Sequence, residues 1–286
     1  MQRIELRGRI VMAGLIKAHV HTSQQLGRGL ADGVDLLAWL RDRIGPYESS
    51  LDGEDSYICS LLWGIEQIRS GVTGFAEAGA QFVDAMGRAV GELGLRAILV
   101  RSTMDSGAGL PARWHKSTDE ALGHQVEALE RWHHRADDRL RAWFGLRTIF
   151  NASDARILPP KELADRARVG IHMHVAEIEG EVRYARAGRG DTTVTHLNRL
   201  GVLVKNLLAV HSVWLTDDER QMYASQDVKV AHCRECWVKC VGKGVGPFGG
   251  LVALGMGLSG PILGSSGVCT GPYRPVFPAT GRAKAG

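Results

Sequence analysis

Strand-like and helix-like segments alternate along most of this chain, and that order constrains its fold more than any other feature. Seven short apolar runs are expected to be strands, at 15–20, 72–76, 96–102, 140–146, 169–175, 207–210 and 228–231. Segments with helical apolar spacing lie at 34–43, 54–70, 82–93, 118–134 and 217–225, at 160–167 where prolines open the first turn, and between 176 and 200. Such alternation predicts a parallel α/β architecture.

The formal net charge is +4, but the basic excess lies near the C-terminus. Glu235 is the last acidic residue, and the 51 residues after it carry five lysines and arginines, so residues 1–235 sum to −1. No basic stripe interleaved with aromatic residues is present, which argues against nucleic-acid binding. No apolar run approaches the roughly 20 residues of a membrane span, and the first residues lack the apolar core of a signal peptide. We therefore expect a cytoplasmic protein that contacts no membrane.

Histidines stand at the ends of three expected strands. His19 and His21 end the first strand, and residues two apart on a strand share a face, so both imidazoles could reach one metal ion. The fifth strand ends in the run IHMHVAE, which carries His174 and Glu177, and His211 ends the sixth strand. A metal ion held by imidazoles generates hydroxide at neutral pH, and a nearby carboxylate can move the proton. Taken singly, each motif could also be a strand end whose histidine only satisfies hydrogen bonds.

These motifs and their flanks resemble the amidohydrolase superfamily, in its deaminase and chlorohydrolase branch. The segment GLIKAHVHTSQQLGRG is similar to the family's first strand and following loop, HVAE to its fifth-strand turn, and VDLLAWLRDRIGPYES to the segment after strand one. The resemblance covers roughly residues 8–235 and is strongest to methylthioadenosine/S-adenosylhomocysteine deaminases, with triazine hydrolases and guanine deaminase as relatives. It implies a (β/α)8 TIM-type barrel of the metal-dependent hydrolase kind.

The resemblance also implies roles for single residues and a reaction. The implied metal ligands are His19, His21 and His174, the implied catalytic residues are Glu177 and His211, and the implied substrate contacts are Trp39, Arg147 and His232. The ion would be zinc or another single divalent ion such as Fe2+. The implied reaction is hydrolysis of a non-peptide carbon–nitrogen bond, by deamination of a purine-like, nucleoside-like or other heterocyclic amine. The partner is then a small heterocyclic molecule, and a homo-oligomer is possible.

The N-terminal part of the chain departs from the family pattern at several positions. The barrel begins almost at Met1, so residues 1–14 are expected to be the remnant of an N-terminal β segment. Arg147 stands where the nucleoside-deaminase branch often has a histidine, and Leu37 stands where that branch often has an acidic residue. Both differences weaken the expectation of a nucleoside substrate.

The C-terminal part departs further. Residues 241–286 hold 13 of the 36 glycines and 5 of the 9 prolines, with no acidic residue, a composition that suits neither a strand nor a closing helix. The family's strand eight normally ends in an aspartate ligand, and none follows Glu235. We therefore expect a barrel over 15–235 that is incomplete at strand eight, with a divergent glycine- and proline-rich tail over 236–286.

Three alternatives stay open. The missing aspartate would also fit a catalytically impaired amidohydrolase-like remnant, and a triazine-type chlorohydrolase would use the same residues on a carbon–chlorine bond. His232, Cys233, Cys236 and Cys240 could instead form a small zinc or iron–sulfur site, because thiolates at such spacings bind either. A disulfide framework is not expected from five cysteines in a long chain without a secretion signal.

Overall fold

The structure is a computed structural model of the 286-residue chain, and it describes residues 5–30, 34–107 and 110–233. Parallel strands form one sheet in the order of the sequence, so each connection crosses over to the next strand. The seven strands are β1 (Leu15–Val20), β2 (Val72–Glu77), β3 (Arg96–Val100), β4 (Leu140–Leu146), β5 (Ile171–Val175), β6 (Leu207–His211) and β7 (Lys229–Ala231). All seven predicted strands are confirmed: β1 and β4 have the predicted bounds, and the other five differ at one end by one or two residues.

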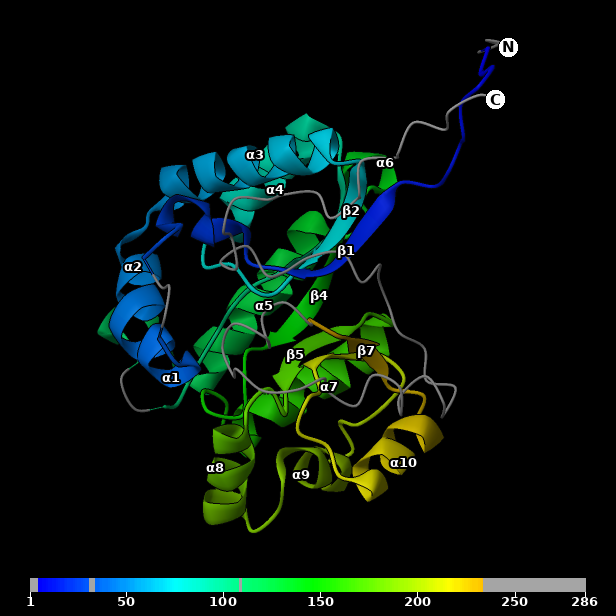
Figure 1. Ribbon diagram of the computed structural model, residues 1–286. Helices are drawn as coiled ribbons and strands as arrows, with labels where there is room; N and C mark the ends of the chain where they lie inside the picture. The colour runs from blue at the N-terminus through cyan, green and yellow to red at the C-terminus, as the bar shows by residue number, and fades with distance from the viewer. Residues whose placement is uncertain (1–4, 31–33, 108–109, 234–286) are drawn as a thin grey trace.

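Helices connect successive strands and lie outside the sheet (Figure 1). The α-helices are α1 (Leu36–Trp39), α2 (Gly45–Ser50), α3 (Gly53–Arg69), α4 (Val83–Leu93), α5 (Thr118–Trp132), α6 (Arg135–Asp138), α7 (Asp154–Ala167), α8 (Glu179–Arg189), α9 (Thr193–Arg199) and α10 (Asp217–Ser225). Two 3-10 segments, η1 (Thr22–Gly27) and η3 (Ala112–Trp114), and a π-helical turn, η2 (Leu40–Ile44), lie between them. Within the described ranges, no helix combines the length and the apolar character that crossing a membrane requires.

One helix begins earlier than the sequence pattern predicts. The helix expected at 160–167 starts at Asp154, because the Ser153 hydroxyl accepts a hydrogen bond from the Arg156 N–H and so caps the first turn. Pro159 and Pro160 consequently lie inside α7. The prediction that prolines open this helix is wrong, since the capping serine decides where the helix begins.

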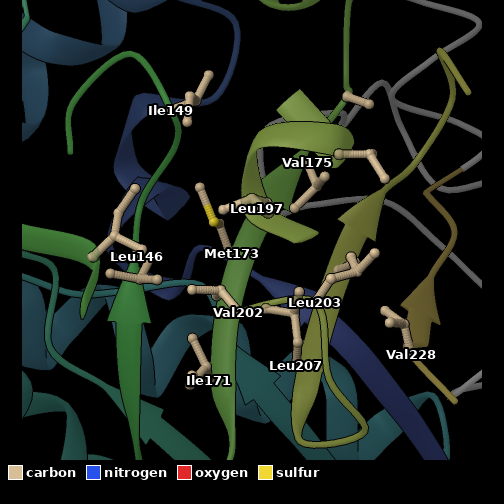
Figure 2. Close-up of a cluster of buried hydrophobic side chains, with 14 of the residues drawn as sticks. Leu146, Ile149, Ile171, Met173, Val175, Leu197, Val202, Leu203, Leu207 and Val228 are labelled. Atoms are coloured by element: carbon tan, nitrogen blue, oxygen red, sulfur yellow. The ribbon is translucent and has the colours of Figure 1, made fainter. Parts of the chain in front are cut away.

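Alternation along β5 separates the two faces of the sheet. Ile171, Met173 and Val175 pack into a buried apolar cluster shared with residues of α7, α8, α9 and α10 (Figure 2). Each fully buried side chain of this size contributes roughly 1.5–3 kcal/mol to stability. His172 and His174, at the alternate positions, therefore face the interior. The same strand thus anchors the outer helices and supplies the interior with imidazoles.

The sheet curls so far that side chains of its first and fifth strands contact each other across the interior. His19 Nδ1 on β1 lies 3.3 Å from His172 Nε2 on β5, although three strands separate β1 and β5 in the sheet. This contact needs a nearly closed barrel. In the part of the chain that is described, β1 pairs only with β2 and β7 only with β6. The divergent tail predicted at 236–286, with its incomplete strand eight, lies outside the described residues.

Candidate metal centre

Histidines gather inside the barrel near the carboxyl ends of β1, β5 and β6. The five members of this histidine cluster are His19, His21, His172, His174 and His211, each at most 5% exposed. Their neighbouring ring centroids lie between 4.9 and 6.0 Å apart. The carboxyl ends of parallel strands meet at one end of a barrel, which brings these residues together. All four histidines that the sequence assigned to metal binding or catalysis are in the cluster, and the structure adds His172.

His19, His21 and His174 form a possible metal site, in which one ring nitrogen from each lies within 4.8 Å of the other two. His174 Nδ1 lies 2.7 Å from the Arg147 carbonyl oxygen. That oxygen can only accept, so Nδ1–H donates and Nε2 keeps its lone pair. His174 Nε2 lies 3.3 Å from His21 Nε2. His21 Nδ1 is buried and has no hydrogen-bond partner among the described residues. A divalent ion between the two Nε2 atoms would use both lone pairs, and three imidazoles suit zinc.

Burial keeps these imidazoles neutral. Desolvation lowers the pKa of His19, His21 and His174 well below 6.5. Coulombic effects of neighbouring histidines lower it further in all three, and Arg147 adds to the lowering for His21 and His174. The pKa of His172 and the pKa of His211 both fall to about 3, again mainly through burial. Neutral imidazole is the form that binds metal ions. The cluster is therefore in its ligand form at neutral pH.

Glu177 follows β5 and lies against His211. Its Oε1 is 3.3 Å from His211 Nε2. Because burial keeps the pKa of His211 low, its ring is neutral and the contact with Glu177 is not an ion pair. The backbone at both strand ends is in the left-handed region, with φ of 50° at Ala176 and 70° at His211. Such conformations are costly for residues other than glycine, and they occur preferentially at functional sites.

Glu181 on α8 holds the turn that carries Glu177. Its Oε1 accepts a hydrogen bond from the Ala176 N–H at 2.8 Å, and its Oε2 accepts one from the Glu177 N–H at 2.9 Å. Burial raises the pKa of Glu181 to about 7, against the opposing effect of these bonds. Sequence reasoning missed this residue, although an acidic residue in the first turn of α8 was a usable signal.

Arg147 and Glu48 form a buried polar pair near the histidine cluster. Arg147 Nη2 lies 3.5 Å from Glu48 Oε2, and both side chains are less than 10% exposed. Ser23 Oγ and Gln24 Nε2 donate to Glu48 Oε1 at 2.9 and 3.1 Å, while Arg147 Nη1 donates to the Gly79 carbonyl at 3.2 Å. The positive charge of Arg147 also lowers the pKa of three of the histidines. The pair therefore contributes to the electrostatics of the cluster.

The other two predicted substrate contacts lie on separate elements. His232 follows β7, and its Nδ1 donates to the carbonyl oxygen of His211 at 3.3 Å. Trp39 is half-buried at the end of α1. Substrate contact by Trp39, Arg147 and His232 stays a prediction.

A cavity of about 1350 Å³ lies at the opposite ends of the strands. It is lined by the first residues of β1 and by Trp143, Gly170, Leu207 and Lys229, among others. No member of the histidine cluster lines it. Because the chemistry of (β/α) barrels occurs at the carboxyl ends of their strands, we place the candidate site at the histidines.

Comparison with known proteins finds matches over most of the chain. The profile of the amidohydrolase family matches residues 10–239. A 5'-deoxyadenosine deaminase from Methanothermobacter thermautotrophicus is 36% identical over 267 residues, which cover 93% of this chain and 60% of that protein. A 5-methylthioadenosine/S-adenosylhomocysteine deaminase from Pelotomaculum thermopropionicum is 34% identical over 261 residues, or 90% of this chain and 58% of that protein. The chain thus spans about 60% of the length of these curated relatives.

Solved structures show the same fold. A zinc-bound adenosine deaminase from Xanthomonas campestris superposes with a TM-score of 0.79 at 29% identity, over 86% of this chain and 54% of that one. A zinc-complexed atrazine chlorohydrolase from Arthrobacter aurescens TC1 also reaches 0.79, at 18% identity, over 86% of this chain and 59% of that one. At that lower identity the likeness extends to the fold alone.

Proposed function

The chain belongs to the amidohydrolase family, and from that membership we propose that it is a metal-dependent hydrolase that deaminates a nucleoside-like heterocyclic amine. Relatives named as deaminases of 5'-deoxyadenosine, 5-methylthioadenosine and S-adenosylhomocysteine support this choice of reaction. The observation that carries the proposal is the buried set of His19, His21 and His174, with the carboxylate of Glu177 beside the same cluster.

We propose zinc as the ion, because the zinc-bound adenosine deaminase shares this fold at 29% identity. His19, His21 and His174 would hold it through ring nitrogens, and Fe2+ is the alternative that imidazole ligands also accept. When bound, the ion lowers the pKa of the attacking water toward neutrality. The neutral state of the buried histidines favours binding, since no proton has to leave them first.

Glu177 is proposed to move the proton. Its carboxylate accepts a proton from the attacking water and delivers it to the amino nitrogen that leaves as ammonia. His211 Nε2, 3.3 Å from Glu177 Oε1, orients that carboxylate. Glu181 fixes the backbone of Glu177 through its two hydrogen bonds to the turn.

The substrate is proposed to be a small heterocyclic molecule. The Arg147 guanidinium offers N–H donors to ring heteroatoms, and Trp39 and His232 are the further proposed contacts. The predictions of a cytoplasmic location, of a homo-oligomer and of no contact with nucleic acid stay predictions.

Ammonia release from 5'-deoxyadenosine and 5'-methylthioadenosine by the zinc-loaded protein tests the proposal. Glu177→Gln should lower kcat by about 10²-fold or more at unchanged zinc content, because general acid–base catalysis contributes on that scale. Glu179→Gln is the matched control, since Glu179 is exposed on α8 and pairs with Arg183 at 2.9 Å. Equal activity in the two variants would refute the role of Glu177.

Two other outcomes would contradict the deaminase proposal as a whole. Chloride release from a chlorinated triazine, with no ammonia from any nucleoside, would favour the chlorohydrolase alternative. Zinc binding without turnover of either kind of substrate would favour a catalytically impaired remnant.

A further inference from the structure

A thiol lies beside the histidine cluster. Cys233 comes two residues after the end of β7 and packs against the small apolar cluster inside the barrel that includes Ala231. Residues two apart along an extended chain face the same way, so the Cys233 side chain follows that of Ala231 into the interior. Its Sγ makes a weak hydrogen bond to the Ala231 carbonyl oxygen at 3.6 Å. The proposed reaction gives this thiol no role.

Cys233 forms a second group of possible metal ligands with His19 and His211. One ligand atom from each of the three lies within 4.8 Å of the other two. The rings of His19 and His211 are 5.4 Å apart and inclined at 72°. His19 also belongs to the group with His21 and His174, so the two ligand groups are adjacent and overlap in one residue.

The two groups differ in charge. Three neutral imidazoles leave the double charge of a divalent ion uncompensated in a buried site, whereas a thiolate supplies one negative charge. Neither group contains a carboxylate among the described residues. A cysteine gives up its thiol proton when it binds a metal ion, and zinc is among the ions that thiolate ligands select. Cys233 therefore offers the compensating charge that the imidazoles lack.

We propose that Cys233 is a metal ligand, and that its thiolate joins His19 and His211 in an alternative position for the ion of this centre. A neutral imidazole has one nitrogen lone pair, so His19 can serve only one ion at a time. The two ligand groups are therefore two positions for a single ion. This inference rests on the proposed metal centre and adds a soft, sulfur-bearing position to it.

X-ray absorption of the full chain, loaded with one zinc per chain, tests the proposal. The background protein carries Cys236→Ser, Cys240→Ser and Cys269→Ser, so that Cys233 and Cys59 are the remaining thiols. We expect a zinc–sulfur shell at about 2.3 Å beside a nitrogen shell at about 2.0–2.1 Å. Cys233→Ser should abolish the sulfur shell and retain the nitrogen shell. Cys233→Ala repeats the test with a side chain that cannot bind metal.

Two histidine variants separate the two positions. His21→Ala removes a ligand from the three-imidazole group alone, so the sulfur contribution per zinc should rise. His211→Ala removes a ligand from the thiolate group alone, so that contribution should fall to the level of Cys233→Ser. With cobalt in place of zinc, the thiolate-to-metal charge-transfer absorption should follow the same order.

Each remaining outcome contradicts the proposal in a distinguishable way. Bound zinc with a nitrogen-only shell in the background protein would overturn the role of Cys233 and leave the three-imidazole centre intact. A sulfur shell that persists in Cys233→Ser would assign the sulfur to Cys59 and also overturn it. Failure of the folded background protein to bind zinc would overturn both this inference and the proposed metal centre.

Discussion

Glu77 ends β2 with a fully buried side chain, and its replacement by glutamine tests how burial sets the protonation of this barrel. Its Oε2 accepts a hydrogen bond from the Thr22 N–H at 3.1 Å, directly after His21, and its Oε1 is buried without a partner among the described residues. Desolvation raises the pKa of Glu77 from 4.5 to about 8, despite the hydrogen bonds from Thr22 that lower it. The folded protein therefore holds a proton that the unfolded chain releases above pH 4.5.

The sign of the pH dependence follows from this raised pKa. The stabilising effect of the bound proton is complete below pH 4.5 and is lost as the pH rises toward 8. Each pH unit in that window corresponds to about 1.4 kcal/mol, so the free energy of unfolding should fall by up to about 3 kcal/mol between pH 5 and pH 7 from Glu77 alone. Glu77→Gln keeps an acceptor for Thr22 but cannot ionise, so it removes this slope.

The assay is urea unfolding of metal-free protein at several values between pH 5 and pH 8, with linear extrapolation to zero denaturant. The stability of Glu77→Gln relative to the natural chain should increase steadily across this range. Glu130→Gln, at an exposed position of α5, is the control and should show no such trend. Parallel pH profiles for the natural chain and Glu77→Gln would show that Glu77 is ionised in the folded protein, which refutes the reasoning.

Three further predictions concern packing, positioning and metal binding. Gly145→Ala should destabilise the fold by about 1–3 kcal/mol in thermal unfolding, because the added Cβ would lie 2.5 Å from the Val100 side chain. Gly123→Ala is the control: its Cβ would have no heavy atom within 4 Å, so this variant should be neutral or stabilising. Glu181→Gln should lower kcat more than it changes zinc affinity, because Glu181 hydrogen-bonds the backbone of the turn that carries Glu177 and contacts none of the proposed metal ligands. An unchanged kcat would contradict this role. His174→Ala should weaken zinc binding by at least about 10-fold in a competitive chelator titration, and retained affinity would count against the three-imidazole site.

The local pattern of the sequence determined the strands and placed histidines at the ends of three of them. Strand and helix periods of two and 3.6 residues are properties of short segments, so all seven strands could be located without knowing what they contact. The same local rule places His19 and His21 at one strand end and His174 at another. Parallel strands then bring those ends together. The choice of these three histidines as metal ligands came from the resemblance to the amidohydrolase family, and it stays a prediction.

Only the tertiary structure decided which other residues join that site. His172 is separated from its partner His19 by 153 positions in the sequence, and no local sequence pattern predicts a contact over that distance. The same holds for the buried pair of Arg147 with Glu48 and for the approach of Cys233 to the histidines. These contacts depend on how far the sheet curls, a property of all the strands together. Periodicity assigns a residue to a face, and barrel closure determines its neighbours.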